Sequence, residues 1–301
     1  MSALAVTCLI ESAAVDHSKR FIPEEFTPLY YTPSYRVLTE EQRLRYNQLQ
    51  ALYFNEQIIF FETAVGRPVL EVLTREGLPR ELTTGLLQFL EEEQQHTEMF
   101  WRLNQQCAPQ FYDIGFFYFI RPPRAWMAVL RRATRHPRLF PMFFWLMFLQ
   151  EERSLFYSRR AIAQRDQLEP HFVKMHRTHL ADEVGHVGWD EELIEVLWRR
   201  ANPSLRKVNV ELLAWMLREF FSTPKRAQLR VIRELAREFP ALSKLEPEIE
   251  CQLLALSGDD GYQRALYSRE MVPRAFARFD ELPEFRSLEL IGYRRQPEGA
   301  R

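Results

Sequence analysis

Hydrophobic and polar residues rarely alternate along this chain in the way that strands require. Instead, long stretches are rich in Leu, Glu, Gln, Arg and Ala, which are good helix formers. Prolines and a Gly-Leu-Pro sequence divide these stretches, so that four long helices are expected. Their approximate ranges are 39–73, 79–106, 137–165 and 169–201. The pattern therefore predicts an all-α protein.

The connections between the predicted helices indicate how they are arranged. Short segments, near 74–79 and 166–170, join the helices of each pair, whereas the link between the pairs spans about 107–136. Two helical hairpins joined by one long crossover are typical of a ferritin-like four-helix bundle. We therefore expect a ferritin-like fold with additional helices on the C-terminal side.

The two ends of the chain differ from this pattern. Residues 1–38 contain three prolines and no sustained period, which indicates an irregular N-terminal arm. From about residue 204, prolines divide the sequence into shorter helices. We expect one ferritin-like domain over 39–301, with the part beyond 204 as its C-terminal helical extension.

Composition and charge exclude several classes of protein. The 301 residues are 46% hydrophobic and 27% charged, so the chain is not disordered. Forty Lys and Arg against 41 Asp and Glu give a net charge of -1, which argues against a nucleic-acid partner. The most apolar run, 139–149, is shorter than the roughly 18 residues of a membrane span, so we expect a buried helix and no membrane.

The cysteines and the N-terminus favour a cytoplasmic location. Cys8, Cys107 and Cys251 are odd in number and far apart, so they form neither a disulfide framework nor a cysteine zinc motif. No basic segment followed by a long apolar run is evident at the start of the chain. Both observations indicate a reducing compartment.

Histidines and glutamates at helical spacing carry the candidate chemistry. In the fourth predicted helix, His179, Glu183 and His186 stand at i, i+4 and i+7, within roughly 60° of one face. The second predicted helix has Glu93 and His96 at i and i+3. Two Glu-x-x-His helices, with one Glu from each of two other helices, form the ligand set of di-iron and di-manganese bundles. We therefore predict a site for two metal ions.

The first and third predicted helices should supply the two remaining glutamates. Glu62 and Glu152 each lie 31 residues before the glutamate of the following motif, whereas Glu56 and Glu151 would lie 37 and 32 residues before it. Glu62 and Glu152 also share a face with apolar residues, so we select them and leave Glu56 and Glu151 outside the site.

Other polar residues of these helices have less specific roles. We expect Glu91, Glu92, Glu98 and Glu151 on solvated faces. His176 and Asp190, together with Asp182, are either surface residues or partners that orient a metal-binding imidazole. His17, His136 and His171 are expected at the surface or in loops.

The combined motif resembles that of the p-aminobenzoate N-oxygenase (AurF-like) family. The match rests on His-x-x-x-Glu-x-x-His, the upstream Glu-x-x-His and the two single glutamates, over about 39–200. The resemblance implies a ferritin-like fold, two non-haem iron ions and O₂ as co-substrate. It places the seven iron ligands at Glu62, Glu93, His96, Glu152, His179, Glu183 and His186, with no other catalytic residue.

The resemblance also implies an oxygenase that converts an arylamine to a hydroxylamine or nitro product. Because the sequence has no cysteine cluster and no Gly-x-Gly-x-x-Gly motif, an external electron donor or reductase is expected. His179 exceeds the minimal set of four Glu and two His, which favours control of O₂ binding over iron storage. The alternatives are a di-iron oxidase acting at carbon and an iron-storage protein. The sequence leaves a homodimer open.

Overall fold

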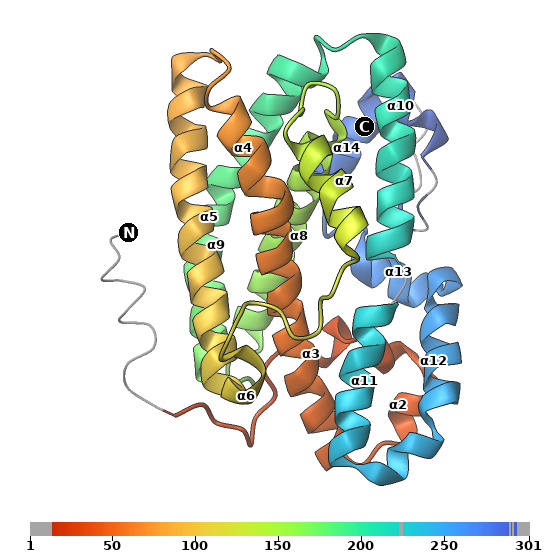
Figure 1. Ribbon diagram of the computed structural model, residues 1–301. Helices are drawn as coiled ribbons and strands as arrows, with labels where there is room; N and C mark the ends of the chain where they lie inside the picture. Colours follow the sequence, from red (N-terminus) through yellow and green to blue (C-terminus); the bar gives the residue numbers. More distant parts are fainter. Residues whose placement is uncertain (1–13, 223–224, 289, 291, 294–301) are drawn as a thin grey trace.

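The computed structural model describes residues 14–222, 225–288, 290 and 292–293, and this part of the chain contains helices but no strand. A long first helix consists of α3 (Glu40–Phe61), the π segment η3 (Glu62–Gly66) and α4 (Arg67–Leu73). With α5 (Arg80–Cys107), α8 (Met142–Ala163) and α9 (Pro170–Leu193), it forms the bundle in Figure 1. The predicted all-α, ferritin-like fold is confirmed.

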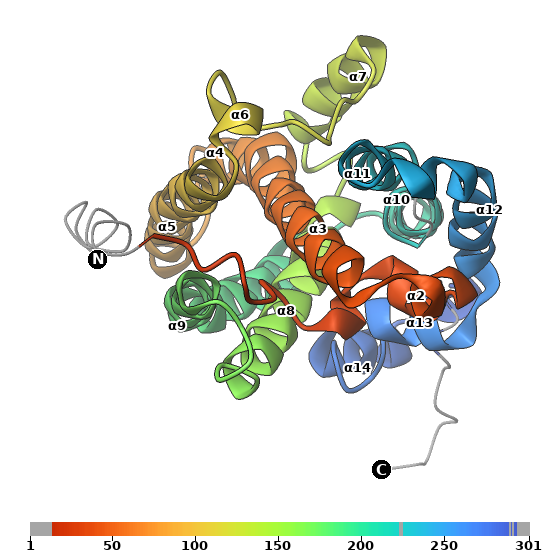
Figure 2. The ribbon, with the colours of Figure 1, turned by 90° about the horizontal axis from the view of Figure 1, so that it is seen from below.

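Shorter helices cover one side of this bundle. In the view along the bundle, α11 lies beside α3, α10 and α14 lie beside α8, and α7 projects outward (Figure 2). The further α-helices are α2 (Pro33–Val37), α6 (Pro109–Tyr112), α7 (Arg124–Thr134), α10 (Pro203–Met216), α11 (Arg226–Glu238), α12 (Glu246–Ala255), α13 (Asp260–Leu266) and α14 (Pro273–Glu281). The short 3₁₀ and π segments are η1 (Glu24–Phe26), η2 (Pro28–Tyr31), η4 (Ile194–Trp198), η5 (Leu217–Phe221), η6 (Pro240–Lys244), η7 (Leu256–Gly258) and η8 (Pro283–Ser287).

Local sequence explains the shape of the first long helix. Thr39 and Gln42 form a capping box at its start, because each side chain accepts a hydrogen bond from the other residue's backbone N–H. Farther along, Pro68 has no N–H to donate to the carbonyl of Ala64. The helix widens here, and the N–H of Arg67 bonds to the carbonyl of Glu62, five residues back. The long helix therefore contains a π segment that begins at Glu62, just before Pro68.

Helix α8 is buried at its start. Every residue from Met142 to Leu149 is buried, as expected for the apolar run. The indole of Trp145 contacts the rings of Phe279 and Phe285, 5.2 and 4.8 Å away between centroids. The C-terminal helices therefore share one core with the bundle, and α8 is apolar on more than one face.

The described part of the N-terminal arm, residues 14–38, packs against the bundle. The N–H of Phe21 donates to Oδ1 of Asn47 at 2.9 Å, and the Phe21 ring stacks on Phe172 with centroids 4.4 Å apart. The first thirteen residues of the predicted arm lie outside the described residues. Among the described residues, we find no helix whose length and hydropathy would let it span a lipid bilayer.

Candidate metal centre

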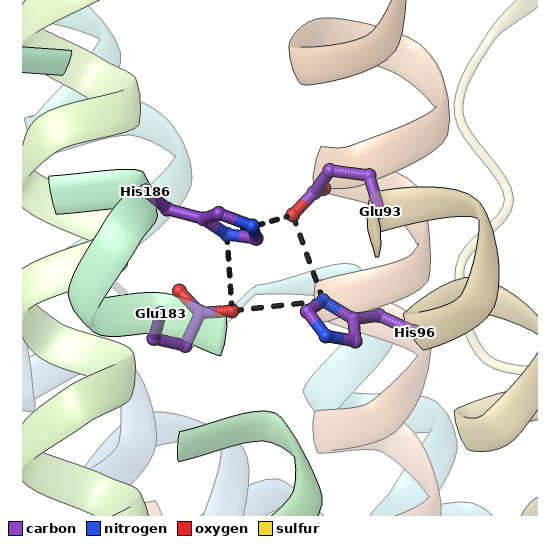
Figure 3. Close-up of side chains that lie close together, drawn as sticks. All are labelled: Glu93, His96, Glu183 and His186. Carbon is purple, nitrogen blue, oxygen red and sulfur yellow. Dashed lines mark ion pairs between the residues drawn. The ribbon is translucent and has the colours of Figure 1, made fainter. Parts of the chain in front are cut away.

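Ionisable side chains meet in the interior of the bundle, where apolar residues would be expected. Glu93 and His96 project from α5, and Glu183 and His186 project from α9, so that the four side chains face one another (Figure 3). One possible ligand atom from each lies within 4.8 Å of the others. The sequence prediction brings these four residues together correctly.

The four side chains alternate between imidazole and carboxylate. Nδ1 of His186 lies 3.5 Å from both Glu93 Oε1 and Glu183 Oε1. Nδ1 of His96 lies 3.7 Å from the same two oxygens. Each carboxylate therefore faces both imidazoles, as Figure 3 shows.

Two further predicted residues adjoin this group. The possible ligand atoms of Glu62, His96 and His179 lie within 4.8 Å of one another, and Nε2 of His179 lies 2.7 Å from Glu183 Oε1. The hydroxyl of Thr97 donates to Glu62 Oε2 at 2.7 Å, which fixes that carboxylate. Six of the seven residues selected from the sequence therefore lie in one buried cluster.

Carboxylates outside the cluster hold two of the three imidazoles. Nε2 of His96 lies 3.1 Å from Asp182 Oδ2, and Nε2 of His186 lies 3.0 Å from Glu92 Oε2. The opposite ring nitrogen of each histidine then faces the cluster. This arrangement is typical of metal-binding histidines, whose second nitrogen donates to a carboxylate.

Glu92 was expected on a solvated face, and that prediction is wrong. Glu92 of α5 contacts the histidine of α9, and Asp182 of α9 contacts the histidine of α5. Each of these two acids directly precedes the glutamate of its own Glu-x-x-His motif. The repeated acid-Glu-x-x-His pattern was thus the available signal for both residues.

Glu152 was selected from the sequence as a ligand, but the structure places its carboxylate outside the cluster. Its carboxylate accepts the N–H groups of Arg274 and Ala275, at 3.0 and 2.8 Å, at the start of α14. The carboxylate of Glu151 points to the cluster instead, with Oε2 3.7 Å from Nδ1 of His186. The apolar face that Glu152 shares with Trp145 packs against the C-terminal helices, so an apolar face on α8 did not identify the metal-facing side.

Glu56 lies outside the cluster, as expected, although it is fully buried. Its carboxylate accepts the hydroxyl of Tyr112 at 2.8 Å. It also accepts the backbone N–H groups of Tyr118, Phe119 and Ile120, at 2.7–3.0 Å. Glu56 therefore anchors the long crossover segment to α3.

Two more buried residues surround the cluster. Asp190, expected on a solvated face or beside an imidazole, is fully buried. Burial, together with the neighbouring charge of Glu151, raises the pKa of Asp190 well above its usual value. Nδ1 of His176 lies 3.2 Å from the hydroxyl of Ser158, and burial lowers the pKa of this imidazole to about 3. Both side chains therefore favour their neutral forms.

Without a nearby cation, the charged form of a buried carboxyl group in the cluster is unfavourable. Burial, followed by the repulsion of Glu93, raises the pKa of Glu62 well above its usual value. Burial and the charge of Glu183 raise the pKa of Glu151 to about 8. Although burial opposes a charge on His96, its hydrogen bond to Asp182 and the nearby carboxylates of Glu93 and Glu183 raise its pKa to about 10. Glu62, Glu151 and His96 therefore favour their protonated forms, which reduces the net negative charge of the cluster.

The inward-facing atoms fit a pair of metal ions. Within the described chain, Oε1 of Glu62 and the Nδ1 atoms of His96 and His186 are buried and have no hydrogen-bond partner. Buried polar atoms without a partner are costly in a folded protein, and metal coordination would remove that cost. Carboxylate oxygens combined with imidazole nitrogens suit iron or manganese.

A cavity of about 70 Å³ adjoins the cluster between α3 and α8. Phe54, Ile58 and Phe61 line its apolar part, and Glu62 and Glu151 line it beside the cluster. A second cavity, of about 490 Å³, shares Gln57, Phe61 and Phe221 with the first. A small molecule thus has an apolar space directly beside the candidate metal ligands.

The family comparison agrees with this geometry. A family model described as p-aminobenzoate N-oxygenase AurF matches residues 10–248 of the chain. The chain belongs to the AurF family. This family is a group of ferritin-like di-iron oxygenases, so the chain is an oxidoreductase with that fold. A search of curated proteins gave no match.

Proposed function

We propose that the protein binds two iron ions and uses O₂ to oxygenate the nitrogen of an arylamine. The proposed ligands come from all four long helices of the bundle. They are Glu62, Glu93, His96, Glu151, His179, Glu183 and His186. The observation that carries the proposal is the set of buried, inward-facing nitrogen and oxygen atoms without hydrogen-bond partners in the described chain.

The arrangement of the side chains suggests how the ligands are divided. Glu93 and Glu183 each face both His96 and His186, which suits carboxylates shared by two cations. Glu62 and His179 lie on the His96 side of the cluster, and Glu151 lies on the His186 side. One ion would then have two imidazoles and the other one, so that the two ions are unequal.

The side chains around the site prepare it for oxygen chemistry. When bound, two ferrous ions supply electrons to O₂. The carboxylates of Asp182 and Glu92 accept the Nε2–H of His96 and His186, which keeps each Nδ1 free to bind metal. Phe89 stacks on His186 with centroids 3.9 Å apart, and Phe100 contacts His179. These rings exclude water and hold the imidazoles in place.

The net reaction determines which reactants must reach the site. Insertion of one oxygen atom into an N–H bond of the amine, with reduction of the other atom to water, consumes two electrons and two protons. We propose that a separate electron donor supplies the electrons. The amine nitrogen would face the cavity of about 70 Å³ beside the cluster, where the Phe54 and Phe61 rings form apolar walls, and the rest of the molecule would extend into the adjoining cavity of about 490 Å³.

Isotope labelling with a metal count tests this proposal. Protein loaded with Fe(II) under argon should contain about two iron ions per chain. After addition of ¹⁸O₂, a chemical reductant and 4-aminobenzoate, mass spectrometry should detect ¹⁸O in a hydroxylamine or nitro product. His186→Ala should form none, whereas Glu91→Gln, an exposed neighbour of the motif, should behave as the parent protein. A protein with one zinc ion, or without labelled product, would contradict the proposal.

A further inference from the structure

We infer that the outward face of α7 binds an acidic one-electron carrier, a [2Fe–2S] protein of the ferredoxin class. The inference rests on the proposed function, because it names the donor of the two electrons that the reaction consumes. Each reduced [2Fe–2S] cluster gives up one electron and becomes oxidised. Two such transfers, together with two protons, release one oxygen atom of O₂ as water while the other enters the N–H bond.

Positive charge is concentrated in the crossover between the two helical hairpins. The segment 109–139 contains six arginines, all exposed, and one acidic residue, Asp113, although the whole chain has a net charge of -1. One of these arginines, Arg138, pairs with Glu76 at 2.6 Å. Four others form no ion pair with the residues that the structure describes, and these are Arg124, Arg131, Arg132 and Arg135. The segment is therefore a local basic region on a nearly neutral protein.

Helix α7 presents three of these charges in one direction. Arg124 and Arg132 are separated by about two helical turns, and Arg135 follows about one turn later. The three side chains therefore lie on one face of the helix. This face is exposed, and α7 projects outward from the bundle (Figure 2). Because each guanidinium offers a planar fork of donors that matches a carboxylate, the face is complementary to an acidic protein.

The apolar residues of this segment favour a protein partner over a lipid surface. Val129 and Ile114 are 67% and 95% exposed. The larger apolar side chains of α7 point inward, since Leu130 is buried and the indole of Trp126 packs on the ring of Phe220 with centroids 4.9 Å apart. A helix that lies in a membrane interface would present such residues to the lipid. The segment also has six arginines and no lysine, and Arg is enriched and Lys depleted at protein interfaces.

The position of α7 connects its outward face to the candidate metal centre. Helix α7 packs against η3, the π segment that begins at Glu62. A cavity of about 720 Å³ lies between them, with Thr63 and Ala64 on the η3 side and Arg131 and Arg135 on the α7 side. Glu62 thus faces the cluster, and the next residue already faces α7. A [2Fe–2S] cluster docked on α7 would have α7 and η3 between it and the proposed iron ligands.

Ferredoxin binding to two matched triple variants tests the inference. In the first variant, the three outward arginines are replaced: Arg124→Gln, Arg132→Gln and Arg135→Gln. The control variant removes three exposed arginines outside the crossover: Arg80→Gln, Arg159→Gln and Arg200→Gln. Both variants lose the same charge, and glutamine is a good helix former, so α7 should keep its structure. Circular dichroism and iron content establish that each variant is folded.

Calorimetric titration of the iron-loaded protein with an acidic plant-type ferredoxin measures the binding. Binding to the parent protein should weaken as the salt concentration rises, because salt screens charges at a surface. The α7 variant should bind about 10-fold more weakly or worse at low salt, and the control variant should bind like the parent. Stopped-flow absorbance then follows the oxidation of reduced ferredoxin by the ferric protein under argon, without substrate. Its rate at low ferredoxin concentration should fall by about the same factor in the α7 variant alone.

The outcomes separate this inference from the proposed function. If labelled product forms with the chemical reductant but ferredoxin does not bind, or binds the parent and both variants equally, the inference is overturned and the function stands. Ferredoxin oxidation that depends on the α7 arginines, in a protein that forms no labelled product, would support the inference and contradict the function. If the triple α7 variant does not fold, Arg132→Glu decides: weaker binding supports the inference, and unchanged binding overturns it. Binding to phosphatidylserine vesicles in place of ferredoxin would assign the face to a membrane and also overturn it.

Discussion

Glu56 and Glu183 are both fully buried carboxylates on long helices, but their surroundings differ completely. Glu56 accepts hydrogen bonds from one tyrosine hydroxyl and three backbone N–H groups. Glu183 is surrounded by side chains that themselves ionise, namely His96, His179 and His186. The protein itself supplies the hydrogen-bond donors for the Glu56 carboxylate, whereas the Glu183 carboxylate lies where several possible metal ligands converge.

The same contrast occurs between two consecutive residues of α8. Glu152 is satisfied by the backbone at the start of α14, where the partial positive charge of a helix N-terminus favours an anion. Glu151, one residue earlier, faces His186 and Glu183. Burial alone therefore does not mark a metal ligand. The absence of backbone donors, combined with neighbouring ligand groups, is the more informative property.

The largest expected effect is the loss of iron when a central imidazole is removed. His96→Ala and His186→Ala should each lose at least one of about two iron ions per chain, because each histidine faces both central glutamates. Turnover should be lost with the metal. Iron analysis after gel filtration measures the content, and His171→Ala, at the start of α9, is the control. A full iron content in both variants would contradict the ligand assignment.

A pair of glutamate variants tests the contrast between Glu56, whose carboxylate is hydrogen-bonded within the protein, and Glu62, whose carboxylate faces the cluster. Glu56→Gln should lower the free energy of unfolding by about 1–3 kcal/mol, since an amide nitrogen replaces an acceptor of backbone N–H groups, and iron should be retained. Glu62→Gln should weaken iron binding but leave the metal-free protein at least as stable, because it removes a carboxylate whose pKa burial raises. Urea denaturation with and without iron measures both effects. Equal effects of the two substitutions on iron binding would contradict the distinction between Glu56 and Glu62.

The outer carboxylates should have a smaller effect than the ligands. Asp182→Asn and Glu92→Gln should each reduce iron affinity by about 10- to 100-fold, because they orient His96 and His186. Competition with a chelator measures the affinity. Glu98→Gln, on the same helix as Glu92 but paired with Arg102, should not change it. If Asp182→Asn lowers the iron affinity and Glu92→Gln does not, the two acids do not play equivalent roles in orienting the metal-binding imidazoles.

The stability of the metal-free protein should also depend on pH. The folded-state pKa values of Glu151 and His96, about 8 and 10, exceed the ordinary values of 4.5 and 6.5. The folded state therefore binds more protons between these limits, and the free energy of unfolding should fall as pH rises from about 5 to 9. Bound iron replaces the protons, so the loaded protein should show a flatter profile. Denaturation series at several pH values measure both, and a metal-free protein that gains stability over this range would contradict the proposed environment.

The sequence predicted the four long helices, their pairing and six of the residues that meet in the cluster. These features follow from local helix signals and from spacing within single helices, which fixes the face on which a side chain lies. The choice between Glu151 and Glu152 could not be made in this way. It depends on α14, which lies more than 100 residues later in the chain and covers the second face of α8.

Other features could not be predicted from the sequence for similar reasons. The acceptors of Glu56 are backbone groups of the long crossover, whose path has no regular period. The role of Glu92 required knowledge that α5 and α9 lie side by side.

Anomalous diffraction at the iron absorption edge, from crystals of the iron-loaded protein, is the most direct test of the central claim. We expect two iron peaks per chain among α3, α5, α8 and α9, with an oxygen of Glu151 roughly 2.0–2.6 Å from iron. Glu152 should still accept the backbone N–H groups at the start of α14. A single peak, no peak, or an iron ion bound by Glu152 in place of Glu151 would contradict the account.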